Sequence, residues 1–302
     1  MKSAQRHVNE GSHWGVDLDI EKFFDRVNHD VLMGKIAKRI EDKRLLKLLR
    51  LYLQAGVMVN GVVMELQEGT PQGGPLSPLL SNIMLDELDK ELERRGHKFS
   101  RYADDCNVYV QSKRAGERVM ESVKRFLQRR LRRKVNETKS AVASVGERKF
   151  LGFSFWWKDE AKIGIAGKSI ERAKGKIRKI VGRTRGISLE RMIKQLNQFT
   201  IGKVAYFRIS EGPTTFQKLD RWICRRLRCF KIKQWKNRAR NRFRELTRLG
   251  LGRGQAAMFA SSRKSWWVLS RTPQISMAMP PAYFQRQGLI SLFQRYGQLQ
   301  SI

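Results

Sequence analysis

Acidic side chains, cysteine and long apolar runs are all scarce in this chain of 302 residues, and each scarcity excludes a class of protein. The chain has 28 Asp and Glu against 62 Lys and Arg, which leaves a formal net charge of +34. Three cysteines cannot build a disulfide framework, and Cys224 and Cys229 lack the second ligand pair of a zinc site. No apolar run reaches the length of a membrane span, and the beginning of the chain has no signal-peptide core. We therefore expect a basic cytoplasmic protein with no membrane partner.

The basic charge is concentrated in the second half of the chain. Residues 1–160 carry 30 basic and 23 acidic side chains, whereas residues 161–302 carry 32 basic and 5 acidic ones, a net +27. Self-repulsion of that size would destabilise a domain unless a polyanion bound to it. Hydrophobic residues make up 41% of the chain, which is enough for a packed core and excludes a disordered basic tail. These observations predict that the second half binds nucleic acid.

Alternation and helix signals predict an α+β first half. Val16–Phe24 begins as a strand of alternating apolar and acidic residues, and Asn28 can cap a helix over residues 29–40. Residues 99–110 have the pattern of a strand, a tight acidic turn and a second strand. Further helices are predicted over about 77–95 and 115–133, with a strand over 149–157, and basic amphipathic helices dominate from Lys168 onward.

Two adjacent carboxylates occupy the acidic turn. Asp104 and Asp105 follow Tyr102-Ala103, and adjacent carboxylates repel each other unless a cation lies between them. Magnesium takes oxygen ligands and shares them with substrate phosphates. Asp19, at the end of the earlier strand, supplies a third carboxylate if the two strands are neighbours. The Asp104-Asp105 pair taken alone is better explained as ordinary turn residues, since Asp is common in turns; the surrounding pattern reverses that interpretation.

Five motifs in order resemble the reverse transcriptases, and in particular the branch that group II introns encode. They are Asp19-Ile20-Glu21-Lys22-Phe23-Phe24-Asp25, Thr70-Pro71-Gln72-Gly73-Gly74-Pro75-Leu76-Ser77-Pro78, Tyr102-Ala103-Asp104-Asp105, Asn136-Glu137-Thr138-Lys139 and Phe150-Leu151-Gly152-Phe153. The resemblance implies an α+β fold, in which a reverse-transcriptase palm with an antiparallel sheet and packed helices precedes an all-α thumb and maturase domain.

The same resemblance implies a two-metal polymerase site. Asp19, Asp104 and Asp105 would hold two Mg²⁺ ions, with the backbone carbonyl of Ile20 as an extra ligand. The ions would activate a 3′-hydroxyl and stabilise the leaving pyrophosphate. Lys139 would donate a proton to that pyrophosphate, although an ordinary surface lysine explains this residue nearly as well.

Four more residues match family positions that contact the nucleotide or the template. Phe24 stands where the family places a ring against the sugar, which excludes a 2′-hydroxyl and selects deoxynucleotides. As one of two adjacent phenylalanines, it is equally a candidate for the core. Gln72 and Gly73 match a loop that packs on the incoming nucleotide and the template, where glycine permits close approach of the backbone. Tyr102, the first residue of its tetrapeptide, belongs to the same set.

From about Lys168 the chain is similar to the thumb and maturase-specific domain of group II intron proteins. The segments that carry this likeness include Leu196-Asn197-Gln198, Gly202–Phe207 and Leu219–Ile223. The resemblance implies binding of group II intron RNA through its phosphates, 2′-hydroxyls and shape. The candidate contacts are Lys203, Arg221, Arg225, Arg226, Arg228, Lys233 and Lys236. The aromatic side chains in these helices are individually better explained as core residues.

The chain is thus expected to comprise a palm domain (1–157), a hairpin linker (158–167), a thumb and maturase-specific domain (168–250) and a basic C-terminal tail (251–302). The implied function is RNA-directed DNA polymerisation, which copies intron RNA into DNA from a DNA primer with dNTPs, together with RNA binding that assists splicing. No paired-cysteine endonuclease module follows, so DNA cleavage is not expected.

One departure from the family pattern supports an alternative function. Asp19 lies 18 residues after Met1, whereas the family has a fingers region upstream of this motif. The alternative is a truncated, polymerase-inactive maturase-type protein that only binds structured RNA. The acidic triad favours the polymerase, and the absent fingers favour the alternative. A separate fragment that contains the fingers would be a further partner.

Overall fold

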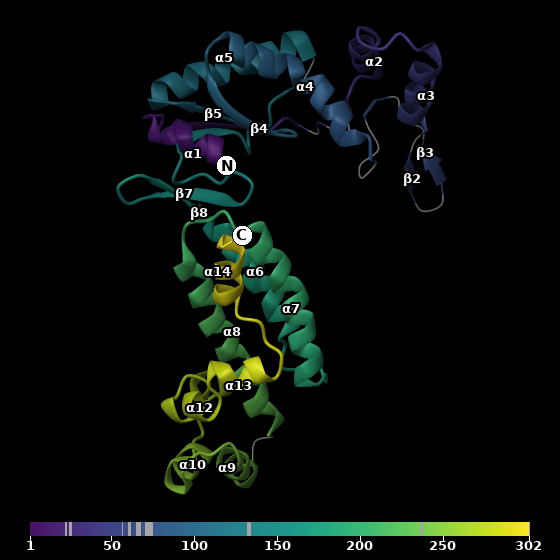
Figure 1. Cartoon of the computed structure of the whole chain (residues 1–302). Coiled ribbons are helices and arrows are strands. Elements are labelled where there is room, and N and C mark those ends of the chain that lie inside the picture. Colours follow the sequence, from purple (N-terminus) through teal and green to yellow (C-terminus); the bar gives the residue numbers. More distant parts are fainter. Residues whose placement is uncertain are drawn as a thin grey trace. The chain divides into compact units, whose positions relative to one another are not determined.

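The computed structural model describes residues 1–302 apart from 22, 24, 25, 56, 60, 61, 65–67, 70–74, 132, 133, 236, 237 and 302; for residues 57–59 and 62–64 only the backbone is described. The chain divides into two compact units, Met1–Lys162 and Ile163–Ile302 (Figure 1). The first mixes helices and strands, and the second is helical apart from the end of one strand.

A four-stranded antiparallel sheet is the centre of the first unit. Its strand order is β4-β5-β1-β6, with bounds β1 Trp14–Leu18, β4 Lys98–Tyr102, β5 Asp105–Val110 and β6 Ala141–Ser144. Because side chains alternate along a strand, Val16 and Leu18 face the opposite side of the sheet from Asp17. Both apolar side chains are buried in the main core. The α+β fold predicted from the sequence is confirmed.

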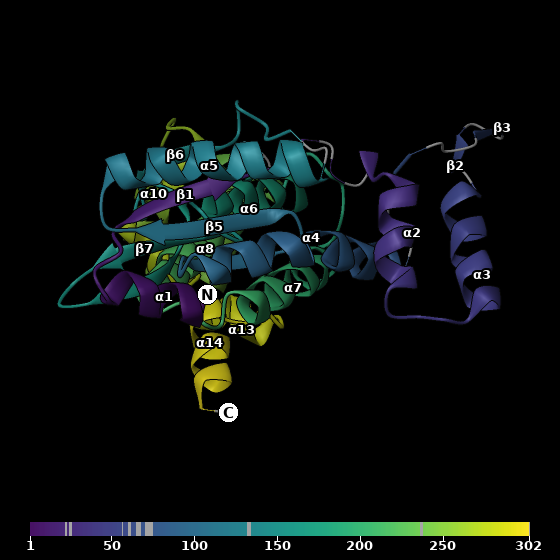
Figure 2. The same cartoon turned by 90° about the horizontal axis from the view of Figure 1, so that it is seen from above.

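Helices pack on this sheet. Helix α5 (Lys113–Leu131) crosses β1, β5 and β6 on the apolar face, as Figure 2 shows. Gly116 makes this close approach possible, since a Cβ there would lie 2.5 Å from Cγ1 of Val142. The remaining elements of this unit are α1 (Lys2–Asn9), α2 (His29–Ala37), α3 (Lys43–Gln54), β2 (Val57–Val59), β3 (Val62–Met64) and α4 (Ser77–Arg94). The Asn28 side chain accepts a hydrogen bond from the Val31 amide, which confirms the predicted cap of α2.

A hairpin spans the boundary between the units. It pairs β7 (Phe153–Trp157) with β8 (Ala161–Ile165). The helices of the second unit are α6 (Gly167–Ile180), α7 (Leu189–Tyr206), α8 (Pro213–Gln234), α9 (Ala239–Arg248), α10 (Arg253–Ala260), α11 (Trp266–Leu269), α12 (Pro273–Ala278), α13 (Pro281–Arg286) and α14 (Leu292–Gln300).

Helix α8 is the central helix of the second unit, and α11, α13 and α14 all contact it. One of the few acidic residues of this unit, Asp220 on α8, fastens the last helix. Its carboxylate accepts hydrogen bonds from the Ser291 hydroxyl (2.8 Å) and from the amides of Leu292 (2.9 Å) and Phe293 (3.0 Å). A carboxylate at a helix N-terminus satisfies amides that have no partner within the helix. Asp220 therefore caps α14 from another element.

All three cysteines are buried. Burial raises the pKa of the Cys106 thiol to about 12 and that of Cys224 to about 11. In the part of the chain that the structure describes, no helix has the length and apolar character needed to cross a bilayer.

Candidate active site and nucleic-acid interface

The sheet register brings the three predicted carboxylates together. Strand β1 pairs with β5 in antiparallel register, so that Leu18 lies opposite Cys106. Asp19 follows Leu18 and Asp105 precedes Cys106, so both carboxylates lie at the same end of this strand pair. Asp104 stands in the turn that joins β4 to β5, where Tyr102 pairs with Asp105. Tyr102 itself is 66% exposed beside the two carboxylates. The expectation that the two acidic segments are neighbours is therefore confirmed, although it does not establish their roles.

Arg101 braces the acidic turn. Its guanidinium donates two hydrogen bonds to Asp89 of α4, at 2.7 and 2.5 Å, and a third at 2.9 Å to the carbonyl oxygen of Ala103 within the turn. Ala103 has a φ of 53°, in the left-handed region that costs a residue with a side chain roughly 1–2 kcal/mol. The bidentate ion pair with α4 helps to hold this strained backbone in place.

Asp19 is fixed by a segment that follows α5. Its amide donates to Ser140 Oγ (2.9 Å), and its carbonyl oxygen accepts from the amide of Asn136 (2.8 Å). Ile20 and Val135 form an isolated antiparallel bridge. The Glu21 amide donates to the Lys134 carbonyl (3.0 Å), so the backbone hydrogen bonds of this bridge lie on either side of Ile20. In an antiparallel ladder the residue between two such bonds turns its own carbonyl away from the partner strand. The Ile20 carbonyl is thus not used by this bridge.

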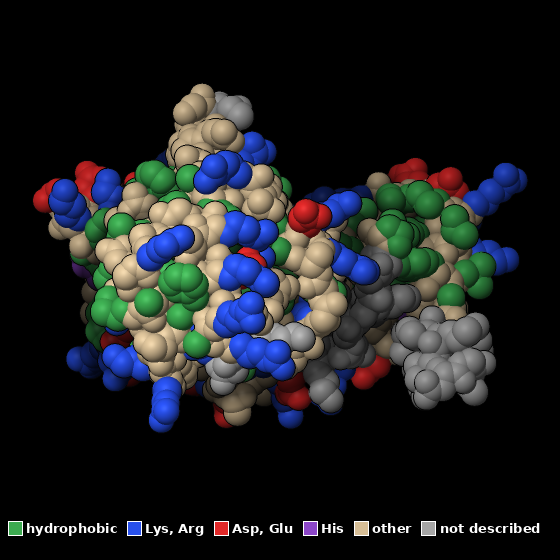
Figure 3. Space-filling model, turned by 90° about the horizontal axis from the view of Figure 1, so that it is seen from below, with side chains coloured by type: hydrophobic (Ala, Val, Ile, Leu, Met, Phe, Trp, Pro, Cys, Tyr) green, Lys and Arg blue, Asp and Glu red, His purple; other side chains and the backbone are tan. Residues whose placement is uncertain are grey.

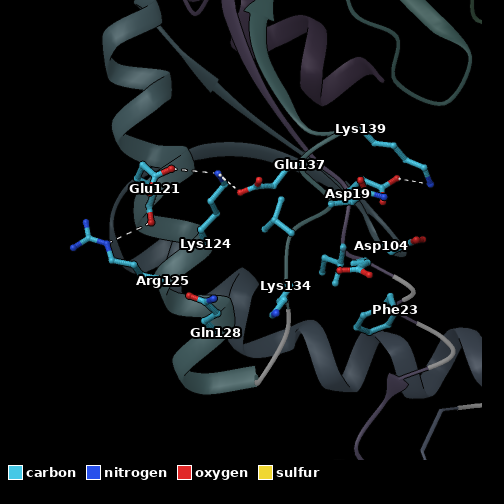
Figure 4. Close-up of a pocket in the computed structure, with 14 residues that line it drawn as sticks. Asp19, Phe23, Asp104, Glu121, Lys124, Arg125, Gln128, Lys134, Glu137 and Lys139 are labelled. Carbon is cyan, nitrogen blue, oxygen red and sulfur yellow. Dashed lines mark hydrogen bonds and ion pairs between the residues drawn. The ribbon is translucent and has the colours of Figure 1, made fainter.

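Lys139 lies at the same site, with its Nζ 3.5 Å from Oδ2 of Asp19. Figure 4 shows Asp19, Asp104 and Lys139 at one end of a cleft of about 1030 Å³. The opposite wall comes from α5, where Lys124 lies 3.3 Å from both Glu121 and Glu137. Arg125, Gln128 and Lys134 also line the cleft. The site therefore opens into a space that carries both signs of charge.

The carboxylates repel one another. Desolvation, followed by the negative charges of Asp104, Asp17 and Asp19, raises the pKa of the Asp105 carboxyl. Since the cause is partly an excess of negative charge, a cation would stabilise this arrangement. Within the described residues, however, no three His, Cys, Asp or Glu side chains are grouped so that they could hold a metal ion as they stand.

Asp17 and Arg148 are parts of this site that the motifs did not reveal. Asp17 lies two residues before Asp19 and forms an ion pair with Arg148, whose Nη2 also donates to the carbonyl oxygen of Lys139 (2.9 Å). Burial raises the pKa of Asp17, and the bond from Arg148 opposes that rise. The alternation of acidic residues in β1 could have indicated Asp17, but its partner is 131 residues away.

The last motif of the first half forms a tight turn. Phe150 and Phe153 exchange backbone hydrogen bonds at 3.0 and 2.9 Å, and both residues between them have positive φ, 53° for Leu151 and 82° for Gly152. Positive φ at both central positions is typical of type I′ hairpin turns. Four predicted contacts, Phe24, Gln72, Gly73 and Lys236, lie outside the described residues.

Two known families match parts of this chain. Residues 2–155 match the family described as reverse transcriptase (RNA-dependent DNA polymerase). The chain belongs to the reverse transcriptase family. Residues 170–250 of the chain match the maturase-specific domain of group II introns. The resemblance to group II intron reverse transcriptases and maturases is thereby confirmed.

Two curated relatives are similar over part of the chain. The group II intron-encoded protein LtrA of Lactococcus lactis subsp. cremoris is 41% identical over 101 residues, which are 33% of this chain and 17% of that protein. Protein YkfC of Escherichia coli K12 is 44% identical over 82 residues, 27% of this chain and 22% of that protein. The chain thus matches less than a quarter of the length of each.

Solved structures give a weaker likeness. The apo telomerase of Candida tropicalis has a TM-score of 0.46 and 11% identity over 98% of this chain and 55% of that chain. A chain of a Cas6-RT-Cas1–Cas2 complex is 31% identical over 42% of this chain and 24% or less of that chain, with a TM-score of 0.25.

The helical second unit lies within residues 161–302, which carry 32 of the basic residues of the chain. Figure 3 shows Lys and Arg side chains spread over the end that α9, α10, α12 and α13 form. Of the predicted RNA contacts, Lys203 and Arg221 are exposed, and Arg225, Arg226, Arg228 and Lys233 on α8 are half-buried. Two of these hold the C-terminal segments: Arg228 donates to Met279 O (2.9 Å), and Arg225 donates to Trp267 O (3.0 Å).

Proposed function

We propose that the first unit of this reverse transcriptase polymerises DNA on an RNA template, and that the second unit binds group II intron RNA and assists its splicing. The observation that carries the first part is the register of β1 and β5, which places Asp19 beside Asp105 and the turn of Asp104. The second part is supported by the match to the maturase-specific domain and by the net charge of +27 over residues 161–302.

Two Mg²⁺ ions fit the chemistry of the donors in this proposal. Asp19, Asp104 and Asp105 supply hard carboxylate oxygens, and the Ile20 carbonyl is not used by the Ile20–Val135 bridge. Desolvation, and after it the neighbouring negative charges, raises the pKa of Asp105, and a cation would offset the second of these causes. When bound, the metal supplies charge neutralisation for the attacking 3′-hydroxyl and for the leaving pyrophosphate. Side-chain rotation would be needed to bring the three carboxylates into one ligand set.

The chain's own residues have separate tasks in the proposed reaction. Lys139 would leave the Asp19 carboxylate and give a proton to the pyrophosphate oxygen that leaves the α-phosphate of a dNTP. Arg101 and Arg148 position the reacting groups: the first holds the turn of Asp104, and the second ties Asp17 to the carbonyl of Lys139. Tyr102, exposed at the end of β4, would contact the template or the nucleotide, together with Phe24, Gln72 and Gly73.

Primer extension on an RNA template with dNTPs and Mg²⁺ tests the polymerase. We expect Asp104→Asn to abolish extension, because removing one metal ligand removes charge stabilisation that the transition state requires. Asp159→Asn removes the same charge from an exposed residue outside the cleft and should leave extension unchanged. A fingers-containing fragment is the remaining partner that we propose, and it should restore extension if the chain alone has none.

A second readout does not depend on turnover. Mg²⁺ should raise the melting temperature of the wild-type chain, since a ligand that binds only the folded state stabilises it. The increase should be smaller in Asp105→Asn. If neither the chain alone nor the chain with the added fragment extends a primer, and structured RNA is still bound, the alternative maturase-type function without polymerisation is supported. Loss of both activities would refute both parts of the proposal.

A further inference from the structure

Three tryptophans and five cations form one cluster in the helical unit, which we call the Arg–Trp cluster. Trp222 is on α8, and Trp266 and Trp267 begin α11. The cations are Arg178 on α6, Arg183 after it, and Arg225, Arg226 and Lys233 on α8. All three tryptophans are half-buried, so each residue keeps part of its surface in contact with solvent.

The cations fall into two kinds by their distance from the rings. The Arg225 guanidinium lies 3.7 Å from the centroid of Trp267, which is stacking distance, and also donates a hydrogen bond to the backbone of that residue. Five other cation–ring distances are longer, and one of them is the 5.6 Å from Arg178 to the centroid of Trp222. Arg183 and Lys233 each lie 5.6 Å from the centroid of Trp266, and Arg226 lies 5.8 Å from Trp222 and 5.7 Å from Trp267. Arg225 is therefore structural, whereas the others lie at the limit of attraction to a ring.

Three of the outer cations have no carboxylate partner among the described residues, whereas Arg178 forms an ion pair with Glu171 (3.6 Å). Among the described residues no ion pair is formed by Arg183, Arg226 or Lys233, and Arg183 has only a long hydrogen bond of 3.7 Å to Cys229 Sγ. Burial, together with the like charges of Arg183 and Arg178, lowers the pKa of Arg226. Arg183, Arg226 and Lys233 have no acidic partner of their own in that part of the chain, so their charges repel one another, and an added anion would relieve that repulsion.

Cations beside a partly open aromatic ring match the two chemical parts of an unpaired nucleotide. Arg and Lys neutralise a phosphate, and an indole stacks on a base that is not held in a duplex. A paired RNA helix presents phosphates but hides the faces of its bases, so it would use the cations and not the rings. We propose that the Arg–Trp cluster binds unpaired nucleotides of RNA, with a base on Trp266 and the adjoining phosphates on Arg183, Arg226 and Lys233. This inference rests on the proposed RNA-binding function and deepens it.

Two synthetic RNA hairpins test the proposal. They share one stem, but in the first the stem contains a short unpaired internal loop. In the second, the nucleotides of that loop are paired with complementary nucleotides on the opposite strand of the stem. Trp266→Ala should weaken binding of the looped hairpin about tenfold, within the range measured for loss of one base–aromatic stack. Binding of the fully paired hairpin should not change. Trp266→Phe should restore most of the affinity, which a loss of folding would not allow, and Trp156→Ala serves as the control for an exposed tryptophan elsewhere.

Salt dependence tests the cations. The variant R183Q/R226Q/K233Q should lower the slope of log affinity against log salt for the looped hairpin by about 2, since each phosphate contact to a single strand contributes roughly 0.7. The control R240Q/R253Q/R286Q removes the same charge from exposed residues of the same unit and should lower the slope much less.

Photo-crosslinking locates the contact. A 4-thiouridine in the unpaired loop should crosslink to the tryptic peptide Ser265–Arg271, which contains both Trp266 and Trp267. Equal binding of the two hairpins, no effect of Trp266→Ala and no crosslink to this peptide would overturn the inference while leaving RNA binding intact. Failure of the wild-type chain to bind either hairpin would refute the proposed RNA-binding function, and this inference with it.

Discussion

Removal of the Asp220 carboxylate should loosen the last helix of the chain. In Asp220→Ala, the amides of Leu292 and Phe293 and the Ser291 hydroxyl lose their acceptor at the start of α14. A hydrogen bond to a charged group contributes about 1.5–3 kcal/mol to stability. Leu292 is buried, so its bond should contribute about 1.5 kcal/mol, whereas water can replace much of the bond to Phe293, which is 39% exposed. We expect a total loss of about 3 kcal/mol in the free energy of unfolding.

The isosteric change Asp220→Asn sharpens this prediction. An amide has one oxygen, so it can accept either from Leu292 or from Ser291 and Phe293 together, and its NH₂ group then faces the remaining donor. The loss in the free energy of unfolding should therefore be about 2 kcal/mol, so that the stability of this variant lies between the stabilities of the wild type and the alanine variant.

Thermal unfolding followed by circular dichroism measures both effects. For a unit of this size, Ile163–Ile302, each kcal/mol lowers the melting temperature by about 2–4 °C, so Asp220→Ala should lower it by about 6–12 °C. Hydrogen exchange of the α14 amides should become faster as well. Glu190→Gln removes one negative charge from exposed residue 190 of the same unit and is the control. If the control variant and Asp220→Ala lower the melting temperature equally, the three bonds do not hold α14 and the reasoning fails.

Further predictions concern two helical glycines, one in each unit, and a histidine of the first unit. Gly116→Ala should destabilise the chain by about 1–3 kcal/mol in urea titrations, because the new methyl meets Val142 at 2.5 Å. Gly175→Ala in α6 has no atom within 4 Å and should instead stabilise by up to about 1 kcal/mol through helix propensity; a loss of stability there would contradict the packing argument. Burial lowers the pKa of His7, so the folded state favours the neutral imidazole. The stability that this residue contributes is fully present above its pKa in the unfolded chain, and it is lost as the pH falls through its lower pKa in the folded chain. The melting temperature should drop on acidification from pH 7 to about 5, and His7→Gln should flatten that slope; identical pH profiles for the two proteins would rule out this residue as the cause.

Local patterns in the sequence predicted the framework of the site. Alternation in β1, the acidic turn after Tyr102 and the Asn28 cap all depend on residues close together in the chain, and the structure places β1 beside β5 as expected. The family motifs added the order of the elements. The sequence predicted basic amphipathic helices from Lys168 onward without their bounds, because such patterns do not mark where each helix ends.

The bonds that hold the site in place could not be predicted in the same way. Arg148 reaches Asp17 across 131 residues, Asp220 reaches α14 across 71 to 73, and Arg101 finds Asp89 on a helix that precedes its own strand. Each is one charged residue among many, and only tertiary packing selects its partner. The same holds for Arg225 and Arg228, whose guanidiniums contact backbone carbonyls of the C-terminal segments that no local pattern indicates.

The buried thiols have a practical consequence for studying this protein. Cys106, Cys224 and Cys229 are all buried. The raised pKa of Cys106, about 12, and that of Cys224, about 11, leave almost no thiolate at neutral pH, and burial raises the pKa of Cys229 as well. Maleimides react with the thiolate, so the native cysteines should remain unlabelled while the chain is folded. One cysteine introduced on an exposed helix could then carry a fluorophore or a spin label, without first removing the natural ones. Movements of the helical unit on RNA thereby become measurable in a chain whose core is unaltered.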